Sequence, residues 1–213
     1  MRKYDTCFFE RYAQISLGSL LGCGYDSLEN RDRPDLQSPD GKTMGIEVTR
    51  SMEESRDAAK SLLKEIAGVS PMEEDLEDMS RIVSSGYAFG LQEGKYIGEK
   101  ELGYWIEAIP LKTIIRRKVA KVTDGFYGKY DKMGLFIFCK DNISDSDVVE
   151  ACRYAMELQK GASIKYDTLY LYEISSLHVC NLAEGRDDME RIVSLPVTQE
   201  LRKEFYLKAL WDK

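Results

Sequence analysis

Histidine and long hydrophobic runs are the scarcest features of this 213-residue sequence. Its single histidine, His178, leaves little room for a histidine-rich metal site or for a relay built on two histidines. A pairing of this histidine with a serine or a cysteine stays open, but no spacing in the sequence favours one. We therefore interpret His178 as a structural residue.

Cysteine is sparse, and its spacing indicates no site. The five cysteines are an odd number and contain no CxxC pair, which argues against both a disulfide framework and a cysteine zinc site. They are Cys7, Cys23, Cys139, Cys152 and Cys180. We expect them to be buried or free thiols.

The sequence also contains no pattern typical of a targeting segment or of two common nucleotide-binding loops. The N-terminus MRKYDTCFFERY reaches Asp5 and Glu10 before any apolar run develops, and no stretch approaches 18 apolar residues. Neither GxxxxGK[ST] nor GxGxxG occurs. We expect a cytoplasmic protein with no signal peptide, no membrane span and no nucleotide-binding loop of these two types.

The composition is that of an ordinary globular protein. Hydrophobic residues make up 43% and charged residues 31% of the chain, and its length suits one domain over residues 1–213. The net charge of −7 excludes a surface that is basic throughout. A local basic strip nevertheless consists of Lys112, Arg116, Arg117, Lys118, Lys121, Lys129 and Lys132. Such a strip can contact a phosphate backbone or be a solvated helix face, and charge alone does not decide between them.

Hydrophobic periodicity and turn signals predict an α/β domain with a mixed sheet. Ser144 and Asp147 resemble a capping box that opens a helix ending at Gly161. A strand, a helix and a strand within about forty residues imply a right-handed parallel crossover. The expected helices are 4–21, 52–67, 110–123 and the one after Ser144. The expected strands are two within 33–51, then 134–139 and 168–175. Residues 69–109 are interpreted as a variable insertion, and residues 184–213 as a helical tail with a turn near Pro196.

The stretch RPDLQSPDGKTMGIEVTRS, residues 33–51, places a carboxylate inside a strand. In TMGIEVT the apolar residues alternate with Glu47, which therefore points to the other face. A three-residue loop that pairs Ser38 with Lys42 would put Asp35 on the Glu47 face, opposite Gly45 and diagonal to Glu47. A two-residue loop would put Asp35 opposite Ile46 instead, on the wrong face.

In the first of these registers, Asp35 and Glu47 could share a cation. Mg²⁺ typically takes one or two carboxylates and keeps several waters. The alternative is a surface hairpin whose acids are merely solvated.

These residues resemble the PD-(D/E)XK nuclease superfamily. Pro34-Asp35 stands in place of its Pro-Asp, and Glu47-Val48-Thr49 in place of its Glu-x-Lys; the resemblance covers roughly residues 4–140. It implies a restriction-endonuclease-like three-layer core in which a mixed central sheet is flanked by helices. It also implies a nuclease dependent on Mg²⁺ or Mn²⁺ that hydrolyses phosphodiester bonds, in DNA rather than RNA, with Asp35, Glu47 and the Val48 carbonyl as metal ligands. A homodimer is compatible with it.

One position departs from the family pattern, because the motif lysine is replaced by Thr49. Some members of the superfamily carry this lysine on a neighbouring helix. On the expected 110–123 helix, Lys118 falls inside the apolar stripe, where a lysine needs a partner, and Lys121 lies at its edge. We expect Lys118, with Lys121, to act as the catalytic cation. A lysine that snorkels to solvent is the alternative.

The resemblance also suggests a further metal ligand, Glu10, because an acid on the first helix often joins the metal site in the family. Thr49 leaves a second function open, a catalytically inactive nuclease-like module that binds nucleic acid or a protein. An unrelated α/β hydrolase is a third alternative.

Overall fold

A computed structural model of the chain describes residues 8–22, 24–50, 111–139, 143–173, 175–183 and 188–211. The expected helix at 52–67 and the expected insertion at 69–109 lie outside the described residues, as does the start of the expected first helix. None of the helices that the structure describes is long and apolar enough to cross a membrane.

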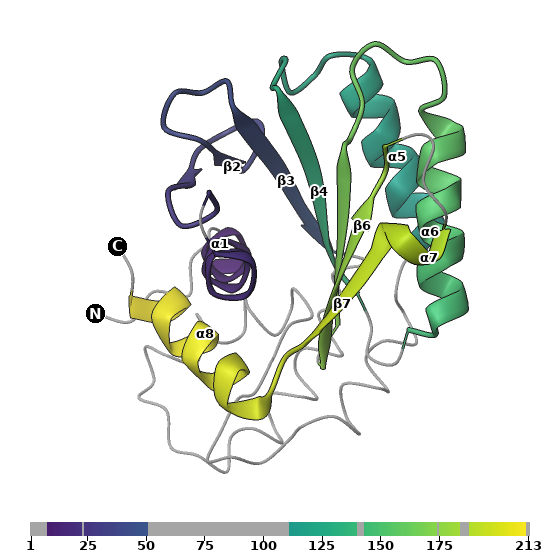
Figure 1. The fold of residues 1–213 in the computed structure, drawn as a ribbon. Coiled ribbons are helices and arrows are strands. Elements are labelled where there is room, and N and C mark those ends of the chain that lie inside the picture. Colours follow the sequence, from purple (N-terminus) through teal and green to yellow (C-terminus); the bar gives the residue numbers. More distant parts are fainter. Residues whose placement is uncertain are drawn as a thin grey trace, which may run out of the picture.

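The described elements form one mixed seven-stranded sheet with helices on both faces (Figure 1). Strand order follows the chain from β1 to β7; the pairs from β3 to β5 are parallel and the other pairs antiparallel. The elements are α1 (Phe8–Leu21), β1 (Glu29–Asn30), β2 (Leu36–Gln37), β3 (Met44–Arg50), α5 (Leu111–Thr123), β4 (Lys132–Phe138), α6 (Asp145–Leu158), β5 (Thr168–Tyr172), β6 (Ser176–Asn181), α7 (Asp188–Arg191), β7 (Ile192–Pro196) and α8 (Gln199–Trp211). The predicted α/β class and mixed sheet are confirmed.

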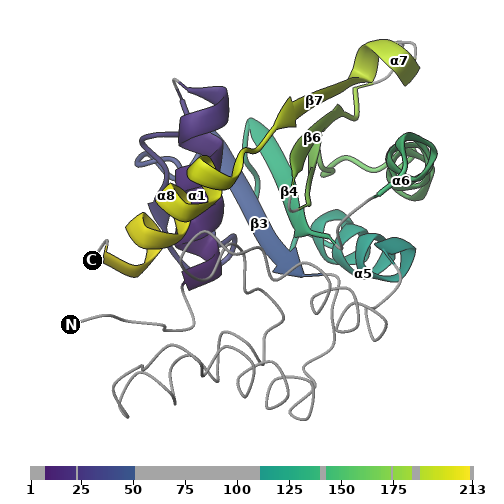
Figure 2. The same ribbon diagram turned by 90° about the horizontal axis from the view of Figure 1, so that it is seen from below.

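Alternating side chains of the central strands supply two separate cores. In β4, Phe136 and Phe138 face α1 and α8, whereas Leu135 and Ile137 face α5 and α6. Viewed from below, α1 and α8 lie on one side of the sheet and α5 and α6 on the other (Figure 2). Because β3 alternates in the same way, one of its faces looks toward α5, and that face carries Glu47.

Local signals set the limits of the helices near the candidate site. The predicted capping box opens α6: Ser144 accepts a hydrogen bond from the Asp147 N–H, and Asp147 accepts one from the Ser144 N–H. At the end of α5, Gly125 has φ +74°, and the N–H groups of Gly125 and Phe126 donate to the carbonyls of Val122 (3.0 Å) and Lys121 (3.0 Å). These two bonds form a Schellman motif, which ends the helix before Asp124-Gly125, as predicted.

The C-terminal third of the chain differs from the prediction. Within the tail expected to be helical, 184–213, α7 and α8 are helices, but residues 192–196 form strand β7, so the prediction is wrong there. Residues 176–181, between the expected strand at 168–175 and this tail, form strand β6, which was not predicted. Both strands are short, and β7 lies at the edge of the sheet with Pro196 as its last residue. An edge position tolerates a proline, which cannot donate to a strand ladder. Pro196 therefore ends a strand, where the sequence had suggested a turn between helices.

Candidate active site

The hairpin of β2 and β3 has a different register from the one predicted. Leu36 pairs with Ile46, and the Ser38 N–H donates to the Met44 carbonyl (2.8 Å), so the predicted pairing of Ser38 with Lys42 is wrong by two residues. A shift of two residues keeps every side chain on its face. Asp35 therefore remains on the Glu47 side of the hairpin, and the pairing continued by one residue places it directly opposite Glu47.

The wider loop, residues 39–43, is organised by Asp40. Its carboxylate accepts hydrogen bonds from the Ser38 hydroxyl (2.6 Å) and from the N–H groups of Lys42 (2.9 Å) and Thr43 (3.0 Å). The bonds from Ser38 and Thr43 hold the pKa of Asp40 below its usual range. Gly41 takes the left-handed conformation that suits a glycine in a turn, with φ +65°. Five residues, not three, are needed because this carboxylate fills the inside of the turn.

Just before β2, the side chain of Asp35 takes the place of a backbone hydrogen-bond acceptor for β3. Its Oδ2 accepts a hydrogen bond from the Val48 N–H (2.8 Å). In the antiparallel ladder, Met44, Ile46 and Val48 direct their N–H and C=O groups toward β2, and the residue opposite Val48 is Pro34. Proline has no N–H, so it cannot donate to the Val48 carbonyl. In this register the Val48 carbonyl, which has no N–H donor on the facing strand, lies next to the Asp35 carboxylate.

Burial and charge repulsion make Asp35 an unusual carboxyl group. Burial, together with the Glu47 carboxylate, raises its pKa from 3.8 to about 6, although the Val48 N–H and the Lys118 ammonium oppose the rise. A partly buried carboxylate beside a second carboxylate attracts a cation, because a bound cation relieves both the desolvation and the repulsion. The electrostatics of this corner thus favour a positive ion between the β2 and β3 acids.

Glu47 is held by the lysine that the helical pattern singled out. The Lys118 Nζ lies 2.6 Å from the Glu47 Oε1, and the side chains expose only 17% and 9% of their surface. The ammonium has no need to reach solvent, so the snorkelling alternative does not describe it. Thr49, at the family's lysine position, points to the same face as Glu47 two residues further along β3. Lys118 of α5 therefore supplies a cation to the site from the opposite layer.

Two tyrosines that the sequence did not single out as site residues close the other side of the cluster. The Tyr127 hydroxyl is buried and makes no hydrogen bond of good geometry to the described residues, although Glu47 and Tyr166 lie close enough to interact with it and to affect its pKa. Burial and the Glu47 charge raise the pKa of Tyr127 well above its ordinary value. Tyr166 is 1% exposed and its hydroxyl reaches the Lys118 carbonyl (3.4 Å). A buried hydroxyl without a partner usually indicates a water or ligand atom.

A sequence signal for Tyr127 exists in hindsight. It follows the glycine that ends α5, in the run DGFYGKY, so the end of the Lys118 helix had to bring it near that lysine. From the sequence alone, Tyr127 is interpreted as a packing residue, with base stacking as the alternative. Tyr166 precedes β5 by two residues and carries no comparable signal.

The remaining predicted site residues lie further from the cluster. Lys121 is exposed, and its Nζ lies 5.1 Å above the ring of Phe126. Glu10 lies on α1, which packs against the sheet face opposite to α5, and no described contact joins it to Asp35 or Glu47. The structure therefore brings together Asp35, Glu47, the Val48 backbone and Lys118, and leaves the roles of Lys121 and Glu10 as predictions.

The donor set of this cluster fits a hard cation with several waters. In the described ranges, no group of three or more histidine, cysteine, aspartate or glutamate side chains could hold a metal ion. Two carboxylates and one carbonyl are nevertheless a sufficient protein contribution for Mg²⁺ or Mn²⁺, since such ions usually keep several waters. A site for a softer metal is not favoured by these oxygen donors.

His178 is fixed within the sheet. Its Nδ1 bonds the Ser194 Oγ (2.8 Å), and its Nε2 faces the Glu173 Oε1 at 3.4 Å without good hydrogen-bond geometry. Glu173 also accepts from the Ile143 N–H (2.9 Å). The contacts from His178 and Ile143 outweigh burial and lower the pKa of Glu173. These contacts hold the buried histidine and carboxylate in place within the sheet, in keeping with the structural interpretation.

The described cysteines are also structural. Cys139, Cys152 and Cys180 are free and buried in the core between the sheet and the helices α5 and α6, as predicted for buried thiols. Burial raises the pKa of Cys139 well above its ordinary value. A thiol with a raised pKa is a poor nucleophile, so this cysteine offers no competing chemistry.

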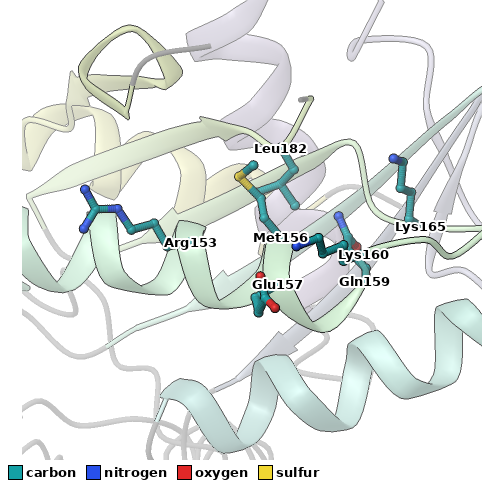
Figure 3. Close-up of a pocket in the computed structure, with 7 residues that line it drawn as sticks. All are labelled: Arg153, Met156, Glu157, Gln159, Lys160, Lys165 and Leu182. Atoms are coloured by element: carbon teal, nitrogen blue, oxygen red, sulfur yellow. The ribbon is translucent and has the colours of Figure 1, made fainter. Parts of the chain in front are cut away.

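A separate hollow of about 510 Å³ lies along the C-terminal half of α6 (Figure 3). Its wall includes Gln159, whose amide bonds both backbone polar groups of Tyr166, at 2.8 Å and 3.0 Å. The lining residues are Arg153, Met156, Glu157, Gln159, Lys160, Lys165 and Leu182. Only one carboxylate contributes to this lining, so the hollow does not offer the paired acids found at β2 and β3.

The geometry of the cluster has to be interpreted on its own chemistry. Comparisons of the chain with family models, with curated proteins and with solved structures found no match.

Proposed function

We propose that the protein is a metal-dependent nuclease that hydrolyses phosphodiester bonds in DNA, built on a restriction-endonuclease-like fold. The observation that carries the proposal is the convergence of Asp35, Glu47 and Lys118 from three different elements. Each was selected from the sequence for this chemistry, and Lys118 lies 71 positions from its partner along the chain. The order of α1, the β2–β3 hairpin, α5 and β4 also agrees with the core order of that fold.

The residues would divide the work as follows. Asp35, Glu47 and the Val48 carbonyl would hold Mg²⁺ or Mn²⁺, which when bound supplies Lewis-acid stabilisation of charge on the scissile phosphate. Lys118 would exchange its contact with Glu47 for a contact with a phosphate oxygen or the attacking water. The Tyr127 hydroxyl, lacking a partner near Glu47, would hydrogen-bond that water or a phosphate oxygen. Glu10 and Lys121 would act at the margin of the site.

The proposal includes the finer expectations about partners and place. The nucleic acid is DNA, approached over a basic strip that begins on α5; the chain works in the cytoplasm, and a homodimer would present two such sites to a duplex. The net charge of −7 requires this contact to be local, because the surface as a whole repels a polyanion.

Cleavage assays test the proposal directly. Purified protein is incubated with single-stranded, double-stranded and branched DNA in Mg²⁺, in Mn²⁺ and in EDTA. We expect cleavage only with metal, and a loss of at least about 100-fold in Asp35→Ala and in Glu47→Ala, as is usual when a positioned electrostatic group is removed. Asp145→Ala, which alters an exposed carboxylate in the first turn of α6, is the matched control. Activity retained by the Asp35→Ala/Glu47→Ala double variant would place the site elsewhere.

Thermal unfolding separates this proposal from the inactive nuclease-like module that Thr49 leaves open. A ligand that binds only the folded state raises the melting temperature. We expect Mg²⁺ to raise it in the wild-type protein and to have no effect in the double variant. A chain that binds DNA but shows neither a metal effect nor cleavage would support the inactive module.

A further inference from the structure

An exposed aromatic ring close to the candidate active site contacts two cations. Phe126 is 48% exposed, although it is among the largest apolar side chains of the described residues. The Arg33 guanidinium carbon lies 5.3 Å from its ring centroid and the Lys121 Nζ lies 5.1 Å from it. We call these three residues the Phe126 cluster.

The fold positions this cluster through two backbone features. The Schellman motif at the end of α5 ties the Phe126 N–H to the Lys121 carbonyl (3.0 Å), which places the ring beside the lysine side chain. Arg33 has φ +62°, a left-handed conformation in which a residue with a Cβ is disfavoured. The arginine reaches the ring from the segment that leads into β2.

Stability alone does not account for the arrangement. An exposed cation–π contact contributes roughly 0.5–1 kcal/mol. The left-handed conformation of Arg33 costs on the order of 1–3 kcal/mol, so the two terms cancel or leave a deficit. Leaving a large apolar ring in solvent adds no stabilisation. Outliers of this kind concentrate at ligand-binding positions, where the strain is retained for function.

The cluster is continuous with the active site on every side. Arg33 precedes Asp35 by two residues, and Lys121 follows Lys118 by one helical turn. The Phe126 ring meets that of Tyr127 edge to face, with centroids 5.2 Å apart. The exposed ring is therefore one aromatic side chain away from the Asp35–Glu47 pair, because the Tyr127 beside it interacts with both acids.

We propose that the Phe126 cluster is a subsite for a single-stranded DNA segment, in which an unpaired base displaces a cation from the Phe126 ring and stacks there while Arg33 and Lys121 bind the flanking phosphates. This inference rests on the proposed nuclease function and deepens it by naming the substrate class: DNA with a single-stranded stretch next to the cleaved bond. Base stacking needs a free base face, which a duplex does not offer, and an aromatic side chain among cations is the recurring form of single-strand sites.

Binding measured in EDTA tests the subsite without requiring cleavage. The probes are a fluorescently labelled 20-nucleotide single strand and the duplex formed from it, followed by anisotropy. We expect Phe126→Ala to weaken binding of the single strand about 10-fold, in the range known for one stacked base, and the duplex less than about 2-fold. Phe126→Trp should bind at least as well as the wild type, because tryptophan also stacks.

The cations are tested by the salt dependence of single-strand binding. Arg33→Ala and Lys121→Ala should each reduce the slope of log affinity against log salt by about 0.7, the value for one phosphate contact on a single strand. Lys203→Ala, an exposed lysine of α8 on the other face of the sheet, is the matched control and should leave the slope unchanged.

The outcomes separate this inference from the function on which it rests. Equal losses for single strand and duplex, or no loss in Phe126→Ala, would overturn the subsite; metal-dependent cleavage that still required Asp35 would leave the nuclease proposal standing. A wild-type protein that neither bound nor cut any DNA would overturn both. A preference for an RNA strand of the same sequence would overturn the assignment to DNA.

Discussion

At the scale of single residues, the central feature is Asp35, a carboxyl group whose charged form is unfavourable in the folded protein. Asp35 is partly buried, faces Glu47 and has a pKa of about 6, so it is destabilising when it is charged and no cation is bound. The groups around it are Glu47, Lys118, the Val48 N–H and Asp32. Residues with this profile are typical of functional sites, where stability is given up for binding.

The pH dependence of stability follows from this shift. The folded-state pKa lies above 3.8, so the folded protein binds more protons between about pH 4 and pH 6 and loses stability as the pH rises through that window. The Asp35→Asn variant cannot ionise and avoids the loss. In metal-free buffer at pH 8 we expect this variant to unfold with a free energy about 1–3 kcal/mol higher than that of the wild type, given 1.36 kcal/mol for each pKa unit.

Urea unfolding measured at pH 4 and pH 8 checks this expectation. The two proteins should converge near pH 4, where the wild-type carboxyl is protonated. A variant that is less stable than the wild type at pH 8, or a difference that does not depend on pH, would contradict the raised pKa.

Lys118 is the second residue on which the proposed mechanism depends. Lys118→Met leaves the buried Glu47 carboxylate without its cation, and we expect a loss of roughly 2 kcal/mol, less than for a fully buried pair because both side chains retain some exposure. Cleavage should be lost. Restoring a lysine on β3 with Thr49→Lys should recover part of both stability and cleavage, since residue 49 shares the Glu47 face.

This expectation is tested by the melting temperature and turnover of the wild type, of Lys118→Met and of the Lys118→Met/Thr49→Lys double variant. Lys112→Met removes an exposed lysine of the same helix and serves as the control. A Lys118→Met variant that cut DNA normally would remove this lysine from the mechanism.

At the scale of elements, the hairpin shows what the sequence can and cannot specify. The alternation in TMGIEVT fixes which side chains share a face, and that prediction survived a register error of two residues because two is an even number. Loop length was mispredicted because the Asp40 carboxylate widens the turn, and turn residues alone do not reveal how many N–H groups a side chain will collect. Helical periodicity was enough to predict that Lys118 lies in the apolar stripe of α5. The position of Tyr166 depends on the conformation of the residues before β5, which no sequence pattern specifies.

Gly45 on β3 packs closely against Pro34, the residue before Asp35. A Cβ on Gly45 would come 2.8 Å from the Pro34 Cγ and 2.9 Å from the Tyr130 Cδ2, closer than real Cβ contacts allow. Neither ring can yield without moving the chain next to it. We expect Gly45→Ala to displace the Pro34-Asp35 segment and to lower the free energy of unfolding by about 1–3 kcal/mol, as for overpacked cores.

Metal binding is the informative measurement for this variant. Gly45→Ala should remain folded by circular dichroism but show a smaller rise in melting temperature with Mg²⁺ than the wild type. Unchanged stability together with an unchanged metal effect would show that the close approach of Pro34 is not needed to place Asp35.

At the scale of the whole molecule, the sheet joins the three parts of the site. The antiparallel hairpin carries the two acids, the parallel pairing of β3 with β4 fixes β3 in the sheet, and α5 crosses the same face to deliver Lys118 (Figure 1). The α/β class, the mixed sheet and the β4–α6–β5 crossover were predictable from periodicity and caps. Strands β6 and β7 were not, because both are short and contain polar residues, and β7 is an edge strand that ends in a proline, so its sequence resembles a turn.

The central claim is that this arrangement binds one hard cation between Asp35 and Glu47. Anomalous diffraction from crystals grown with Mn²⁺ tests it most directly. The account predicts an anomalous peak within coordination distance, about 2–2.5 Å, of both carboxylates and the Val48 carbonyl, with Lys118 turned away from Glu47. A peak elsewhere, or an unbroken contact between Lys118 and Glu47 with no peak beside it at saturating Mn²⁺, would contradict it.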